Sequence, residues 1–170
     1  VFSSFDLSLN ADNGITFNQN VISAGTTTID SDVDNNGVGD FTIATSKELS
    51  TTNNTLQITA NDLDLSGKLN SGMASTELLV SDDGTIGLGD VGGNLTITGA
   101  ELALITATDL TVRTKGSSGA IKTGSGITDA NTENISGTFK IDADGDLTLG
   151  TGLIDLNGRK LSLASDEGKI

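Results

Sequence analysis

The chain has 170 residues, including 22 Gly and only five Phe as aromatic side chains, and it contains no Pro, Cys, His, Trp or Tyr. The absence of Cys and His excludes a disulfide framework, a thiol nucleophile, an imidazole zinc site and a Ser-His triad. With 23 acidic against 9 basic residues, the formal net charge of -14 argues against nucleic acid and anionic membranes as partners and makes cations the natural counterpart.

Short apolar triplets, with one hydrophobic residue on either side of a polar or small one, recur along the whole chain. Alternation with period two is typical of a strand buried on one face. In chain order the predicted strands contain residues 5–7, 41–43, 56–58, 63–65, 86–88, 95–97, 110–112, 139–141, 147–149, 154–156 and 161–163. Gly, Asn, Asp and Ser fill the turns between them. No helical segment is expected between these strands.

Strands this short and this closely spaced predict a coil in which each turn stacks on the one before. We therefore expect one module over residues 1–170, an all-β, right-handed parallel β-helix (solenoid). Three strands and their turns take about 20 to 25 residues, which gives roughly seven or eight turns with a rise of ~4.8 Å each. No apolar run approaches the roughly 20 residues needed to insert across a membrane.

The Asp-rich segment 30–40 carries the one motif with specific chemistry. Read from Asp32 it gives D-x-D-x-N-G-x-x-D, in which oxygen ligands at alternate positions can converge on a hard cation such as calcium. The predicted ligands are Asp30, Asp32, Asp34, Asn36 and Asp40. An EF-hand is excluded because its twelfth position is an Ile and no helix flanks the loop. A plain acidic turn stays open as the alternative, and it is the interpretation favoured for the shorter acidic cluster 142–146.

The two ends of the chain resemble halves of one strand. One pattern occurs at 11–15, 81–86 and 165–170: a small residue, Asp, any residue and Gly, followed by an Ile. If the first residues of the chain are written directly after the last copy, the strand pattern continues across the join. Neither end shows the polar cap that an exposed terminal turn of a solenoid needs. We expect an end-to-end interface between tandem units or copies of the chain, formed by Val1, Phe2, Phe5, Lys169 and Ile170. A chance match in a sequence rich in Asp and Gly is the alternative.

Three segments carry a family resemblance: TTNNTLQITANDLDLSG at 51–67, GTIGLGD at 84–90 and GNLTITGAEL at 93–102. They resemble the giant repetitive β-strand-repeat surface proteins of marine microbes and, more distantly, filamentous-haemagglutinin-type adhesins. The likeness is closest over residues 12–109. It implies a secreted parallel β-helix, outside the cell or on its surface, that binds copies of itself or a surface glycan or host surface. It carries over no catalytic residues.

Two other functions were weighed against a structural repeat unit of an extracellular filament or surface adhesin. A carbohydrate-active β-helix enzyme could use a row of carboxylates at Asp6, Asp64 and Asp155, but the aromatic platforms that grip sugars are missing. An ice-binding module is suggested only by the Thr pairs at 96/98 and 106/108. The sequence therefore predicts a non-enzymatic, self-associating structural protein with calcium as the one candidate cofactor.

Overall fold

The computed structural model describes residues 1–116 and 118–170, and this part of the chain is nearly all-β, with 41% strand and 5% helix. Every strand pairing among these residues is parallel. The prediction of an all-β chain of parallel strands is confirmed.

The strands form four sheets. The seven-stranded sheet holds β2 (Leu7–Asn10), β5 (Thr27–Asp30), β8 (Leu56–Ala60), β11 (Thr76–Val80), β15 (Leu110–Arg113), β17 (Thr138–Ala143) and β19 (Lys160–Ser165). The five-stranded sheet holds β1 (Phe2–Ser3), β4 (Val21–Ser23), β7 (Glu48–Ser50), β10 (Lys68–Asn70) and β14 (Ile105–Thr106). The three-stranded sheet holds β3 (Ile15–Phe17), β6 (Phe41–Ile43) and β9 (Leu63–Leu65). The four-stranded sheet holds β12 (Ile86–Leu88), β13 (Leu95–Ile97), β16 (Ile121–Thr123) and β18 (Leu147–Leu149).

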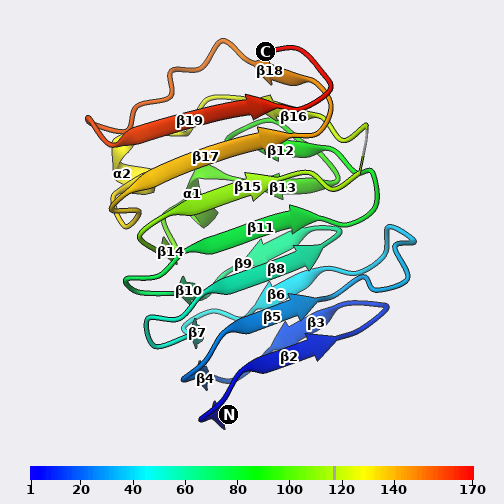
Figure 1. Cartoon of the computed structure of the whole chain (residues 1–170). Helices are drawn as coiled ribbons and strands as arrows, with labels where there is room; N and C mark the ends of the chain where they lie inside the picture. The colour runs from blue at the N-terminus through cyan, green and yellow to red at the C-terminus, as the bar shows by residue number, and fades with distance from the viewer. Residues whose placement is uncertain (117) are drawn as a thin grey trace.

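The chain returns to the same sheet at regular intervals. Over the first ten strands, each strand pairs with the strand that comes three later in the chain. Thus β1 pairs with β4, β4 with β7 and β7 with β10. The seven-stranded sheet follows chain order from β2 at one edge to β19 at the other, and Figure 1 shows this stack rising from the N-terminal to the C-terminal end. This order is compatible with a coil, although the four sheets are separate.

The core consists mainly of aliphatic side chains, with Phe17, Phe41 and Phe139 among them. Along the seven-stranded sheet one inward column runs through residues paired strand by strand: Ile29, Ile58, Leu78, Val112 and Ile141. These side chains are at most 1% exposed. Because alternation places every second residue inward, strands of three residues suffice to build this narrow core.

Two predicted strands differ from the observed ones. Alternation predicts the first strand at 5–7, whereas β2 begins at Leu7 and its two inward residues are Leu7 and Leu9. The triplet at 154–156 is not a strand. In both places two apolar residues lie two positions apart, as in a strand, but the triplet is not paired with a neighbouring strand. Alternation alone cannot distinguish a paired triplet from an unpaired one.

The connection between β12 and β13 reverses the order of the stack. These strands follow each other in the chain yet pair in parallel, with β13 below β12 and β16 above it. Parallel neighbours ordinarily need a connection of about a dozen residues, but here the chain returns through residues 89–94 only. The return lies directly on β12, because a Cβ at Gly87 would overlap the Val91 carbonyl and a Cβ at Gly93 would overlap the Gly87 nitrogen.

Two single-turn helices, which the sequence analysis did not expect, follow the four-stranded sheet. They are α1 (Gly99–Leu102) and α2 (Asp129–Thr132), with Thr98 and Thr128 as their N-caps. Helices of four residues are too short to give a helical period. They stack on each other, with the Asn131 side chain donating to the Gly99 carbonyl at 2.9 Å. Neither of these helices, taken from the described part of the chain, is long and apolar enough to cross a membrane.

Candidate functional site

The N-terminal end of the stack leaves apolar side chains uncovered. β1, β2 and β3 are the edge strands of their sheets, so nothing in the described chain pairs with their outer sides. Leu7 and Leu9 point into the core but are only half-buried. A hollow of about 310 Å³ opens beside them and is also lined by Val1, Phe17 and Val21. The core is therefore accessible from this end.

The predicted interface residues at this end are all strongly exposed: Val1 by 79%, Phe2 by 68% and Phe5 by 79%. Phe2 pairs with Ile22, which is itself 42% exposed, so Phe2 stands on the outer side of the five-stranded sheet. Leu7, which is not among the predicted interface residues, packs against the core and lines the hollow at this end.

The C-terminal end of the stack is open along the seven-stranded sheet. β19 is the other edge of the seven-stranded sheet, and its inward residues Leu161 and Leu163 are half-buried. Lys169 is exposed and Ile170 is 67% exposed, and the Lys169 carbonyl accepts the Leu147 N–H at 2.8 Å. The last residues thus lie beside β18, in the four-stranded sheet.

The two termini lie at opposite ends of the stack and beside different sheets (Figure 1). A strand running from Ile170 directly into Val1 would have to join the four-stranded to the five-stranded sheet. The geometry therefore favours face-to-face stacking of the two ends over the continuation of one strand.

Asp32, the central residue of the predicted calcium loop, is fully buried. One carboxylate oxygen accepts the Asn36 N–H at 3.2 Å, and the other accepts the Gly37 N–H at 3.2 Å and the Ser81 hydroxyl at 2.5 Å. Protein donors thus already occupy both oxygens, and a calcium ion would have to displace them. Ser81 follows β11, so this carboxylate also fixes the loop to a distant strand.

Three of the other predicted ligands also accept hydrogen bonds from the protein. Asp30 accepts the Asp32 N–H at 3.2 Å, the Asp34 carboxylate accepts the Asn36 side-chain amide at 2.7 Å, and Asp40 accepts the Asn61 amide at 3.3 Å. A search of residues 1–116 and 118–170 finds no group of three or more acidic side chains placed to hold a metal ion. Calcium binding stays a prediction.

Five Asp or Asn side chains connect successive repeats by accepting a backbone N–H from the next repeat. The pairs are Asp6 with Thr26 (2.8 Å), Asn53 with Met73 (2.9 Å), Asp90 with Ser125 (2.5 Å), Asp109 with Thr138 (2.6 Å) and Asp146 with Lys169 (3.0 Å). In every pair the acceptor comes earlier in the chain, and the residue before the donor is Gly. We call these the Asx–Gly contacts.

The Gly of an Asx–Gly contact makes room for the side-chain oxygen of the other partner. A Cβ at Gly25 would lie 2.5 Å from Asp6 Oδ1, and one at Gly137 would lie 2.6 Å from Asp109 Oδ1. The sequence pattern predicts only turns at these residues. These contacts have a sequence signal: an Asp or Asn is followed 20 to 35 residues later by the donor residue, and a Gly stands directly before that donor.

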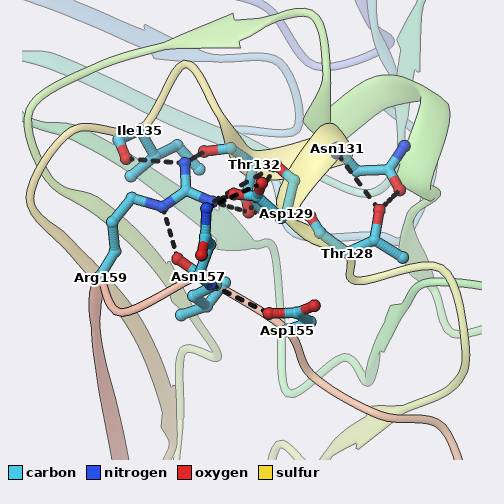
Figure 2. Close-up of polar contacts among 9 residues, drawn as sticks. Thr128, Asp129, Asn131, Thr132, Ile135, Asp155, Asn157 and Arg159 are labelled. Carbon is cyan, nitrogen blue, oxygen red and sulfur yellow. Dashed lines mark hydrogen bonds and ion pairs between the residues drawn. The ribbon is translucent and has the colours of Figure 1, made fainter.

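Arg159 attaches the segment before β19 to α2 (Figure 2). Its side chain is 18% exposed. Nε donates to the Leu156 carbonyl at 2.8 Å, and Nη1 donates to the carbonyls of Thr132 and Ile135. Nη2 pairs with the Asp129 carboxylate at 2.7 Å. Since α2 has no other basic residue near its C-terminal carbonyls, this arginine caps the helix, a structural role.

An ion-pair network lies on the outer face of the seven-stranded sheet. Arg113 is 4.0 Å from Glu77, 3.9 Å from Asp142 and 4.0 Å from Asp144, and Lys140 pairs with Asp142 at 2.7 Å. Burial raises the pKa of Asp144, while Arg113 opposes that rise. These distances describe charges that stabilise a polar sheet face.

The carboxylates proposed for an enzyme do not form one row. Asp6 precedes β2, Asp64 lies in β9 beside Thr42, and Asp155 lies between β18 and β19, where it accepts the Asn157 N–H at 3.0 Å. For the ice-binding alternative, the neighbour of Thr96 in β12 is Gly87, so the predicted Thr pair does not continue into that strand.

No known protein family, curated protein sequence or solved structure matches this chain. The likeness to repetitive surface proteins therefore stays an expectation, and function has to be argued from the ends of the stack.

Proposed function

We propose that this chain is a structural or adhesive repeat unit of an extracellular filament or large surface protein, and that its units join end to end. The observation that carries the proposal is the pair of open ends. Each presents an unpaired edge strand of the seven-stranded sheet and two half-buried leucines, Leu7 and Leu9 at one end and Leu161 and Leu163 at the other. Unpaired backbone groups beside apolar side chains form a template for another strand.

The proposed architecture is one right-handed parallel β-helix of seven or eight turns that includes all four sheets. The regular return of the chain to each sheet supports it, as does the right-handed sense of nearly all crossovers between parallel strands. In such a coil, each added unit extends the same core, so a unit at the end of an array gains burial by binding another.

The extracellular setting of the proposal is supported by the charge balance. Units with a net charge of -14 repel one another, and a medium rich in salt or in divalent cations screens that repulsion. Calcium, proposed at the segment 30–40, would act in the same direction.

Sedimentation velocity over a wide concentration range tests end-to-end association. The wild-type protein is expected to form species that grow with concentration. The Leu9→Asp variant should sediment as a monomer, because an unpaired charge within a buried junction costs several kcal/mol, on the order of 3.

Ser8→Asp is the matched control for Leu9→Asp. It adds the same charge one residue away on β2, where the side chain is exposed and points outward. It should associate nearly as well as the wild type. Identical monomeric sedimentation of the wild type and both variants at every concentration would refute the proposed function.

A further inference from the structure

The two edge strands of the seven-stranded sheet have matching sequences. β19 begins Lys160-Leu161-Ser162-Leu163, and β2 with its preceding residue reads Asp6-Leu7-Ser8-Leu9. In both strands the leucines face the core and the serine faces outward, as their pairing with the neighbouring strands fixes. The strands therefore have the same side chains at equivalent positions of the same sheet.

We propose that β2 of one copy pairs in parallel with β19 of another, in the register that places Leu7 on Leu161, Ser8 on Ser162 and Leu9 on Leu163. The proposal rests on the end-to-end association proposed above and specifies its partner, a second copy of this chain, and its geometry. It continues the inward column of the sheet from Ile141 through Leu163 to Leu9 of the next copy.

The hydrophobic pattern specifies this register. A slip by one residue would place the leucines of one strand beside the serine column of the other, so that apolar side chains would face water. A slip by two residues keeps the leucines on the core side, but it separates Lys160 from Asp6, the charged residues at the starts of the two strands. In the proposed register Lys160 of one copy faces Asp6 of the next, and both side chains are exposed. One Asp6 oxygen accepts the Thr26 N–H within its own copy, which leaves the other oxygen for Lys160.

The charge distribution favours a head-to-tail arrangement. Residues 1–46 contain six acidic and no basic residues, whereas residues 159–170 contain three basic and two acidic residues. Two N-terminal ends would repel each other, while an N-terminal end and a C-terminal end attract. A head-to-tail contact leaves one free end of each kind, so that it propagates into a filament.

The register can be tested with cysteines, since the chain has none of its own. The single variants Ser8→Cys and Ser162→Cys are mixed under mild oxidation and the rate of disulfide-linked dimer formation is measured. Stacked ends hold the two thiols at an effective concentration of about millimolar, so at micromolar protein this mixture should cross-link at least about tenfold faster than either variant alone.

The matched control for register is a mixture of Asn10→Cys with Ser162→Cys. Asn10 is exposed and faces outward on β2, two residues beyond Ser8. This pair should cross-link several times more slowly than the Ser8 pair. Equal or faster cross-linking through Asn10 would overturn the proposed register.

The charge pair is tested by adding Lys160→Glu to the Ser162→Cys variant. Facing Asp6, the new carboxylate should slow cross-linking to the Ser8→Cys protein by about three- to tenfold, since like charges oppose association. Lys122→Glu, an equal charge change on an exposed residue within the stack, should have little effect. Equal rates for the two variants would contradict the Lys160–Asp6 contact.

The outcomes separate this inference from the proposed function. Growth in sedimentation without preferential cross-linking between Ser8→Cys and Ser162→Cys overturns the register and leaves end-to-end association standing. Monomeric sedimentation together with background cross-linking overturns both.

Discussion

Single Asp and Asn side chains perform a specific task in this chain, because each Asx–Gly contact satisfies a backbone N–H where one repeat meets the next. Asp109 is half-buried and its contact with Thr138 is 2.6 Å long. Hydrogen bonds to charged acceptors are stronger than neutral ones. The Asp and Gly content that marks the sequence as turn-rich thus also sets how successive repeats stack.

Replacement of Asp109 by Ala should lower the free energy of unfolding by about 1 to 3 kcal/mol, because the Thr138 N–H loses its acceptor. Asp109→Asn keeps the acceptor oxygen and should cost less. The measurement is thermal unfolding followed by far-ultraviolet circular dichroism, since the chain has no Trp or Tyr to report by fluorescence. Equal melting temperatures for the Ala variant and the wild type would show that the contact contributes nothing.

Gly137→Ala should cost about 1 to 3 kcal/mol by overpacking against Asp109 Oδ1. In the double variant with Asp109→Ala that oxygen is gone, so the loss should be smaller than the sum of the two single losses. Simple additivity in this double-mutant cycle would indicate that the two residues do not act on each other.

Two acidic residues should give opposite pH responses. Burial raises the pKa of Asp62 above 3.8, with the nearby Asp40 and Glu101 adding to the rise and two backbone N–H donors opposing it. The hydroxyl of Ser125, followed by its N–H, lowers the pKa of Asp90. A folded state with a raised carboxyl pKa gains stability as pH falls through that pKa, and one with a lowered pKa loses it.

Asp62→Asn should therefore raise the melting temperature at pH about 7. The wild type should gain stability as the pH falls from about 7 to about 4, the ordinary pKa of an Asp carboxyl, and the variant should gain less. Asp90→Asn should lower the melting temperature at neutral pH. Melting curves across this pH range are the assay, and changes of the same sign in both variants would contradict the assignment.

At the scale of elements, the short return from β12 to β13 depends on two glycines. Gly87→Ala should destabilise the protein by about 1 to 3 kcal/mol, because the new methyl group has to displace the Val91 carbonyl. Gly92→Ala is the matched control in the same connection, since nothing lies within 4 Å of its Cβ position. Equal chemical denaturation midpoints for the two variants would argue against the close crossing.

The second element that depends on one side chain is the segment before β19. Arg159→Lys should lower the free energy of unfolding by about 1 to 3 kcal/mol and speed hydrogen exchange in residues 128–135, because lysine cannot reproduce the planar fork of donors. Arg113→Lys is the control, since Arg113 is 43% exposed and its carboxylates lie 3.9 to 4.0 Å away. Exchange that is equally fast in both variants would show that Arg159 does not hold α2.

The strands could be predicted from the sequence where alternation coincides with pairing, as at 41–43 and 63–65. The reversal of β12 and β13 could not, because it depends on how closely two backbone segments approach at Gly87. The end-to-end interface predicted at Val1, Phe2, Phe5, Lys169 and Ile170 stays a prediction. Leu9 and Leu163 were not among the predicted residues, because in the sequence an inward position on an edge strand looks like any other core position. The spacing of the segment 30–40 predicts a calcium site, which stays a prediction. The hydrogen bond from Ser81 to the buried Asp32 could not be predicted, because Ser81 lies far along the chain.

At the scale of the whole molecule, the central claim is that this chain is a building unit whose two ends bind each other. Seven paired strands with a spacing of about 4.8 Å make a unit about 34 Å long. Negative-stain microscopy of the protein at increasing concentration tests this directly. End-to-end binding predicts unbranched rods of constant width whose lengths increase in steps of about 34 Å. Isolated particles of a single size at every concentration would contradict it.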